Sequence, residues 1–301
     1  MTPTVQQVAL PGEDSAQTPK TKYQGCTVVF GTHHGKEGQV AKPFFDILGA
    51  HVIAPPSLDT DQFGTFSGEI RRLLSPLDAS RAKARLAIAE TGHPWALASE
   101  GSYGLLPGIG WPGHEEILVF VDDTRGIEIV EGHRSLGVPG TVLDVTSHCE
   151  IGDGLAHAGW PAQAVIVRPA IPSDGEETGI TKGISDAAAL ASAIARAVHI
   201  SSNGRAVIEP DLRAHHSPSR RAILCQLGVT MATRLARACP ACESPGWGKT
   251  GISAGLPCSA CGLPTDQTRA DIWSCVACLH EEPLLRQEET AEPRSCAHCN
   301  P

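Results

Sequence analysis

Short apolar runs alternate with amphipathic segments along residues 23–238. Runs of this length between turn residues predict buried strands, and apolar residues at helical spacing predict helices. The predicted strands are residues 26–30, 51–54, 95–98, 164–168 and 205–209. The predicted helices are residues 37–48, 76–91, 185–198 and a long one from 218 onward. This alternation predicts an α/β fold with helices flanking the sheet.

Residues at both ends of the predicted helix 76–91 support its boundaries. Ser75 is a good N-cap, Pro76 suits the first helical position, and Gly92 can end the helix. Asp78 lies in the first turn, where the helix dipole favours negative charge. Pro43 counts against one continuous helix over residues 37–48, because proline has no backbone N–H to donate to a helical hydrogen bond.

Two apolar runs, 117–121 and 127–130, flank the turn-rich residues 122–126. They predict a β-hairpin, which makes the sheet mixed rather than purely parallel. In the last helix, apolar residues recur every four positions and predict a single buried stripe. These residues are Ile223, Leu227, Met231 and Leu235.

Four Cys-x-x-Cys pairs follow the α/β region. They are Cys239/Cys242, Cys258/Cys261, Cys275/Cys278 and Cys296/Cys299. Two thiolates at this spacing can bind one tetrahedral metal ion from a tight turn, and two such knuckles complete a four-thiolate site. The pattern therefore predicts two structural zinc ions in a zinc-ribbon-like module over residues 239–301.

Two other uses of these cysteines are less compatible with the sequence. Disulfide frameworks rarely consist only of Cys-x-x-Cys pairs, and a redox pair needs one such motif between a thioredoxin-like strand and helix. The knuckles can pair in three ways. Sequential pairing, first with second and third with fourth, is the expectation, because the intervening stretches are typical of ribbons.

Charge and composition limit the possible partners. The chain carries a net charge of −9. Residues 239–301 hold four basic and eight acidic side chains, a balance of −4, and eight thiolates with two Zn²⁺ would add −4. Nucleic acid is therefore a disfavoured partner, and a protein partner is the alternative for this module. No apolar run approaches the ~20 residues of a membrane helix.

The N-terminal residues 1–22 are polar and contain no basic segment followed by an apolar one. They are expected to form a disordered tail, and a cytoplasmic location fits the cysteine usage. The expected organisation is thus a tail (1–22), an α/β ligand-binding or catalytic domain (23–238) and a zinc-binding module (239–301).

Polar residues follow the first predicted strand, at the start of a helix. Thr32, His33 and Lys36 belong to the sequence GTHHGKE at residues 31–37. Exposed backbone N–H groups, a helix dipole and a lysine together suit a phosphate group. An ordinary strand-to-helix turn with a solvated lysine remains the alternative.

Acidic and hydroxyl side chains occur in two further stretches. Glu69 follows a Gly-rich segment, and carboxylates there could hold Mg²⁺. Ser99, Glu100 and Ser102 come directly after a strand, where α/β sheets usually bind ligands. The alternative in both cases is a surface loop with solvated acids.

A basic stretch precedes the last helix. Arg213, His215 and Arg220 lie in the sequence DLRAHHSPSRR at residues 211–221. Arginine side chains beside a helix N-terminus favour an anionic ligand. A solvated helix start is the alternative.

Several segments together resemble an uncharacterised bacterial family, the domain of unknown function 6671. They are GTHHGKE, LDTDQFGTFSGEI, ASEGSYG, VIVRP, DLRAHHSPSRR and the cysteine pairs that end in Cys-Asn-Pro. The resemblance runs from about residue 28 to residue 301. It implies no activity.

The order of motifs in the first half is similar to that of inosine triphosphate pyrophosphatases. The matching positions are Thr32 to Lys36, Thr65-Phe66 with Glu69, Lys83-Ala84, Ser99 to Ser102, and His215 to Arg220. One Glu replaces that group's double acid, and the last stretch differs in residue order. The resemblance implies hydrolysis of a nucleotide.

The sequence therefore leads to two functional hypotheses. The first is a Mg²⁺-dependent hydrolase of a nucleotide or similar phosphorylated molecule, with Lys36, Glu69, Lys83 and Glu100 as catalytic residues. Thr32, His33, Ser99, Ser102, Arg213, His215 and Arg220 would bind the substrate. The second is a non-enzymatic anion sensor or adaptor whose zinc module contacts a protein.

Overall fold

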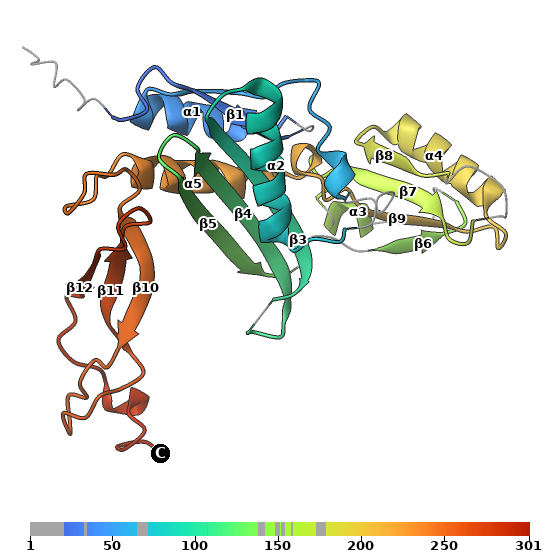
Figure 1. Cartoon of the computed structure of the whole chain (residues 1–301). Coiled ribbons are helices and arrows are strands. Elements are labelled where there is room, and N and C mark those ends of the chain that lie inside the picture. Colours follow the sequence, from blue (N-terminus) through green and yellow to red (C-terminus); the bar gives the residue numbers. More distant parts are fainter. Residues whose placement is uncertain are drawn as a thin grey trace, which may run out of the picture.

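The computed structural model describes residues 21–32, 35–64, 72–106, 108–137, 142–147, 151, 154–157, 159–172 and 179–301. The expected tail lies almost wholly outside these residues. The described residues form three sheets, and helices flank the first two. The predicted mixed α/β fold followed by a cysteine-rich module is confirmed (Figure 1).

The central sheet has five strands in the order β2-β1-β3-β4-β5. The strands are β1 (Thr27–Phe30), β2 (His51–Ile53), β3 (Trp95–Leu105), β4 (Pro112–Asp122) and β5 (Ile127–Leu136). Strand β1 runs parallel to β2 and β3, whereas β3, β4 and β5 form an antiparallel meander. The predicted hairpin is confirmed as β4–β5.

Helices cover both faces of this sheet. Helices α1 (Glu37–Leu48) and α5 (Pro218–Leu235) pack on one face, in a core that includes Phe44, Phe120 and Met231. Helix α2 (Pro76–Thr91) packs on the other face through small residues such as Ala84 and Ala87 (Figure 1). Successive residues of β3 and β4 therefore point alternately toward α1 and α5 on one face and toward α2 on the other.

Most of the predicted helix boundaries are confirmed. The Ser75 hydroxyl accepts a hydrogen bond from the Asp78 backbone N–H at 3.1 Å, and Gly92 ends α2 in the left-handed conformation. The helix predicted at 37–48 is confirmed as α1, which continues through Pro43. The helix predicted at 185–198 begins two residues later, at Ala187, because Asp186 caps α4 (Ala187–Ile200).

A second sheet has the strand order β6-β9-β7-β8 and packs on α4. Its strands are β6 (Leu143–Val145), β7 (Val165–Pro169), β8 (Thr181–Ile184) and β9 (Ala206–Pro210), and the short helix α3 (Gly154–His157) lies beside them. The chain passes from β9 through the 3-10 turn η3 (Ala214–His216) into α5.

The cysteine-rich module contains a three-stranded antiparallel sheet, β10-β11-β12. Its strands are β10 (Gly248–Ala254), β11 (Thr268–Ser274) and β12 (Glu281–Leu285). This ribbon extends from the body on the side away from the second sheet (Figure 1). No helix among the described residues is long and apolar enough to cross a membrane.

Strand β3 is longer than its apolar run predicts. Residues 99–104 were expected to form a loop after the strand, but they continue β3 and pair with residues 113–118 of β4. The expectation of a loop there is wrong, because backbone pairing with β4 outweighs the polar and glycine-rich composition. Ser99, Glu100 and Ser102 are therefore held rigidly by the sheet.

Candidate functional site: two four-cysteine groups and a buried charged cluster

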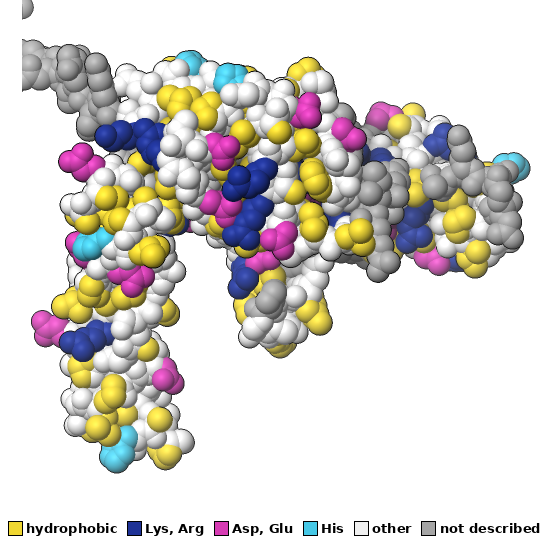
Figure 2. All heavy atoms as spheres, in the orientation of Figure 1, with side chains coloured by type: hydrophobic (Ala, Val, Ile, Leu, Met, Phe, Trp, Pro, Cys, Tyr) yellow, Lys and Arg dark blue, Asp and Glu magenta, His cyan; other side chains and the backbone are white. Residues whose placement is uncertain are grey.

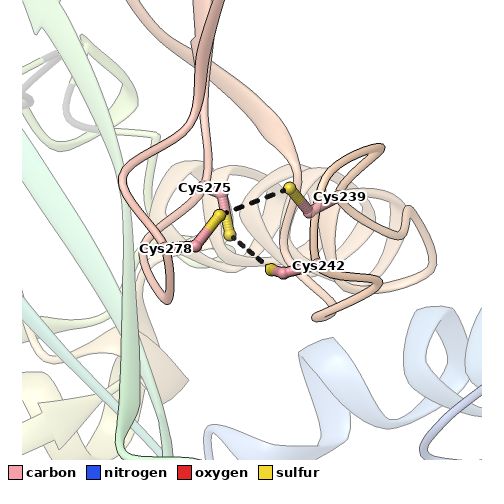
Figure 3. A group of neighbouring side chains, drawn as sticks. All are labelled: Cys239, Cys242, Cys275 and Cys278. Carbon is pink, nitrogen blue, oxygen red and sulfur yellow. Dashed lines mark hydrogen bonds between the residues drawn. The ribbon is translucent and has the colours of Figure 1, made fainter.

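The eight knuckle cysteines gather into two groups of four. Cys239, Cys242, Cys275 and Cys278 form the first group (Figure 3), and Cys258, Cys261, Cys296 and Cys299 form the second. Within each group all sulfur atoms lie within 4.8 Å of one another. All eight thiols are free in this structure, and two sulfur pairs in each group are 3.7–3.9 Å apart, far beyond disulfide length.

This geometry fits a tetrahedral zinc ion. A tetrahedron with Zn–S bonds of about 2.3 Å has edges of about 3.8 Å. The sulfur atoms of Cys239 and Cys278 are 3.8 Å apart, and those of Cys242 and Cys275 are 3.7 Å apart. In the second group the corresponding distances are 3.9 and 3.7 Å. Both groups could hold zinc.

The expected pairing of the knuckles is wrong. The first knuckle joins the third and the second joins the fourth, so the two groups interleave along the chain. The antiparallel sheet explains this arrangement. Strands β10 and β11 return the chain to its starting end, which brings Cys275 beside Cys239 and leaves Cys258 at the far end of the hairpin.

The first three knuckles share one pattern of backbone hydrogen bonds. In the first, the Ala241 N–H points to the Cys239 sulfur at 3.4 Å, and the Glu243 N–H donates to the Cys239 carbonyl at 2.9 Å. Glu243 and Leu279 adopt positive φ after the second cysteine of their knuckles. Non-glycine residues rarely do so, which indicates that the knuckle geometry dictates this conformation.

A cluster of buried charges lies where β3 continues past the end of β1. Both Glu100 carboxylate oxygens accept hydrogen bonds from cations. Lys83 of α2 donates at 2.5 Å, and Arg72 donates at 2.6 Å. Glu100 is only 5% exposed, and these cations together with Lys36 lower its pKa although burial alone would raise it. Glu100 therefore stays ionised in the interior.

Lys36 approaches the same place from the start of α1. Its ammonium group donates to the Ser99 carbonyl at 3.0 Å and to the Ser99 hydroxyl at 3.2 Å. Burial lowers the pKa of Lys36 to about 8, with Arg220 and Lys83 adding to the shift and Glu100 opposing it. Gly31 lets the end of β1 approach the backbone of α2 closely, since a Cβ there would overlap the Lys83 carbonyl.

A buried ion pair lies on the other face of β3. Two N–H groups of Arg220 donate to the Glu116 carboxylate at 2.8 and 2.9 Å. His114 contacts the same carboxylate at 3.2 Å, and its ring stacks on Tyr103. Burial opposes ionisation, but Arg220 and His114 lower the pKa of Glu116 to about 2. Arg220 is 1% exposed, so it contacts Glu116 rather than solvent.

A small cavity adjoins the cluster. It has a volume of about 200 Å³, and its polar lining comes from Arg72, Glu100 and Ser102. Its apolar lining comes from Phe63, Leu74, Pro76 and Ala79. The cavity therefore gives a ligand a route to Glu100 and Arg72 from the α2 face.

The structure brings together only some of the predicted site residues. Lys36, Lys83, Ser99, Glu100 and Ser102 lie at the cluster or the adjoining cavity. Thr32 is buried beside the end of β1. His33 and Glu69 lie outside the described residues, as does the Thr65-Phe66 segment, so the distance from Glu69 to Glu100 stays untested.

The basic stretch before α5 divides into separate contacts. Arg213 forms an ion pair with the buried Asp211 at 2.6 Å, and Asp211 also accepts the Gly183 N–H at 2.9 Å. The rings of His215 and His216 lie against each other, 3.9 Å between centroids. These contacts join η3 to the second sheet, whereas Arg220 belongs to the buried cluster.

Sequence reasoning missed three members of the cluster: Arg72, His114 and Glu116. His114 and Glu116 occupy alternate positions of β4, on the same face as Leu118 and Phe120. Polar residues at core-facing positions of a strand are a readable signal of a buried polar site. Arg72 offers no such signal, because it reaches Glu100 from an irregular segment.

The fold and these groups define an α/β protein with a C-terminal ribbon whose two cysteine groups could hold zinc. The chain belongs to the family described as domain of unknown function DUF6671, whose model matches residues 83–301. The match includes Lys83, Glu100, Glu116, Arg220 and all eight knuckle cysteines. No curated protein matches the chain significantly.

Proposed function

We propose that the α/β body binds the phosphate groups of a small molecule, with nucleotides as the first class to test, and hydrolyses it. The observation that carries this proposal is the convergence of Lys36, Lys83 and Glu100 at the end of β1. The carboxyl ends of parallel strands are where open α/β sheets bind ligands.

Charge supports an anionic ligand. Four cations of the cluster, Lys36, Arg72, Lys83 and Arg220, face two carboxylates, Glu100 and Glu116. The cluster is thus locally positive in a chain of net charge −9. On the face shown in Figure 2, basic and acidic side chains lie next to each other, so the surface there provides no such positive field. Ion pairs nearer the surface, such as Arg81–Glu128 and Arg134–Glu115, have the same effect.

The proposal does not need Mg²⁺ for binding. A magnesium ion at Glu100 would compete with Lys83 and Arg72, which already occupy both carboxylate oxygens. The expected second carboxylate, Glu69, lies outside the described residues. The binding experiment is therefore done both with and without Mg²⁺. The zinc ions we propose for the two cysteine groups have structural roles, because each would have four thiolate ligands.

Isothermal titration calorimetry tests the binding step. Pyrophosphate, inosine and xanthosine triphosphates and ATP are titrated with and without Mg²⁺. Lys83→Met should weaken binding by at least ~10-fold, since it removes a charge-assisted donor. Lys42→Met on α1 is the control, because Lys42 is 82% exposed and lies outside the cluster. Absence of binding to every probe, or equal effects of both variants, would contradict the proposal.

Turnover separates the two candidate functions. Release of phosphate or pyrophosphate from a bound nucleotide supports hydrolysis. Binding without turnover supports an anion sensor, which one observation favours: Arg72 and Lys83 occupy the carboxylate that would otherwise hold a metal ion or water. Binding of a protein by the ribbon is then the next property to measure.

A further inference from the structure

Helix α5 is fixed to the central sheet by a buried arginine near each end. Arg220 in the first turn pairs with Glu116 of β4, and Arg234 in the last turn pairs with Glu131 of β5 at 2.9 Å. The two arginines are about 21 Å apart along the helix and nearly four whole turns apart, so they point to the same side. One end of α5 therefore lies at the charged cluster and the other at the ribbon.

The first cysteine group begins directly after α5. The Arg237 carbonyl accepts hydrogen bonds from the N–H groups of Gly246 and Trp247 at 3.0 and 3.2 Å, which closes the loop containing Cys239 and Cys242. The Gly246 carbonyl accepts a hydrogen bond from Arg234 at 3.0 Å. A Cβ at Gly246 would overlap the Ile129 side chain, so this loop lies directly against β5.

The third knuckle also contacts the body. Val276, between Cys275 and Cys278, packs against the core cluster that contains Leu235, Met231 and Ile129. Trp247 packs with Cys239 and Cys275 in a small apolar cluster of its own. Both knuckles of the first group are therefore attached to α5 and β5.

The second cysteine group is held from within the ribbon. The Cys258 N–H donates to the Leu263 carbonyl at 2.8 Å, and the Ser259 N–H donates to the Ala291 carbonyl at 2.9 Å. This group lies at the end of the ribbon far from the body (Figure 1). Its metal would join two parts of the ribbon to each other and neither of them to α5.

We infer that the two cysteine groups have different roles. Metal in the first group is part of the α/β body and fixes α5, whereas metal in the second group stabilises the outer ribbon alone. Because α5 carries Arg220 to Glu116, loss of metal from the first group also loosens the charged cluster. Whether the first group holds its metal then controls the proposed anion-binding site. This last part of the inference rests on the proposed function.

Two matched double variants test this inference. Cys239→Ser with Cys242→Ser removes half of the first group, and Cys258→Ser with Cys261→Ser removes half of the second. Metal analysis should find about one zinc per chain in each, as expected for four-thiolate sites. Amide hydrogen exchange over residues 218–235 should be at least ~10-fold faster in the first variant and unchanged in the second.

Side-chain NMR of His114 extends the measurement to the cluster. His114 contacts Glu116, so its ring resonances should shift in the first variant and keep their wild-type positions in the second. Equal exchange in both variants, or wild-type protection of α5 in the first, would overturn the inference. If the first variant does not fold, stepwise removal of zinc from the wild-type protein with a chelator replaces it as the test.

In that experiment one zinc should leave with α5 still protected, and loss of the other should coincide with faster exchange in α5. Protection that survives removal of both zinc ions would reject the inference. Pyrophosphate affinity is measured in parallel. If wild-type protein does not bind pyrophosphate, the proposed function fails, and hydrogen exchange still decides the roles of the two groups.

Discussion

Arg220 and Glu116 form an ion pair in which two guanidinium N–H groups meet both carboxylate oxygens, while neither side chain is more than 1% exposed. A third N–H of Arg220 donates to the Leu212 carbonyl at 2.6 Å. The pair joins α5 to β4 and belongs to the charged cluster. Removing one partner leaves the other charge buried without compensation, so the cost exceeds that of a surface pair.

Glu116→Gln should lower the free energy of unfolding by roughly 3–5 kcal/mol, the typical cost of breaking a buried ion pair from one side. Glu115→Gln is the control, because Glu115 is the next residue of β4 and pairs with Arg134, which is 50% exposed. Its cost should be below about 1 kcal/mol. Urea denaturation measures both, and similar values would show that burial of the Arg220 pair contributes little.

Gly101 leaves room for this pair. A Cβ at this position would overlap the Arg220 guanidinium and the Glu116 carboxylate. Gly101→Ala should therefore destabilise the protein by roughly 1–3 kcal/mol, as overpacking does. Gly132→Ala on β5 is the matched control, since the nearest atom to its Cβ would be 3.9 Å away. A thermal midpoint lowered equally by both would contradict this account.

Anion binding should weaken as the pH rises through about 8. Burial lowers the pKa of Lys36 to about 8, so its ammonium group is charged below this pH and neutral above it. Pyrophosphate affinity should fall by up to ~10-fold for each pH unit above 8, as one proton is linked to binding. Calorimetry between pH 6.5 and 9.5 measures this, and Lys36→Met should remove all of the dependence except the part that comes from ionisation of pyrophosphate itself.

Interleaved pairing predicts which cysteine substitutions act together. Cys242→Ser and Cys278→Ser should deplete the same zinc, so combining them should leave about one zinc per chain, whereas Cys242→Ser with Cys261→Ser should weaken both sites. Metal analysis after gel filtration distinguishes these combinations. Retention of one tightly held zinc by the second combination would contradict the interleaved arrangement.

Local signals in the sequence predicted local structure well. Ser75 and Gly92 set the two ends of α2. The Ser75 side chain accepts a hydrogen bond from a free backbone N–H at the N-terminus, and Gly92 adopts the left-handed conformation that ends the helix. Pro43 was a misleading signal. The missing donor costs one hydrogen bond, which burial of Phe44 and Val40 in the core offsets.

The charged cluster could be predicted only in part. Lys36 and Glu100 stand out because they lie in polar stretches at the ends of predicted elements. Lys83 lies inside the predicted helix 76–91 and is indicated only through the resemblance to inosine triphosphate pyrophosphatases. Glu116 lies just before the apolar run 117–121, and its partner Arg220 is over a hundred residues away in sequence. That contact depends on how α5 packs across β4, which no local pattern encodes. Knuckle pairing was missed for the same reason, since it depends on the hairpin of β10 and β11.

The interleaved cysteine groups determine how the ribbon responds to cleavage of its backbone. A cut between residues 261 and 275 leaves one fragment with the first two knuckles and the other with the last two. Each metal would then take two thiolates from each fragment, so both metals would hold the severed pieces together. Sequential pairing would have given each fragment a complete site of its own, and the fragments could have separated.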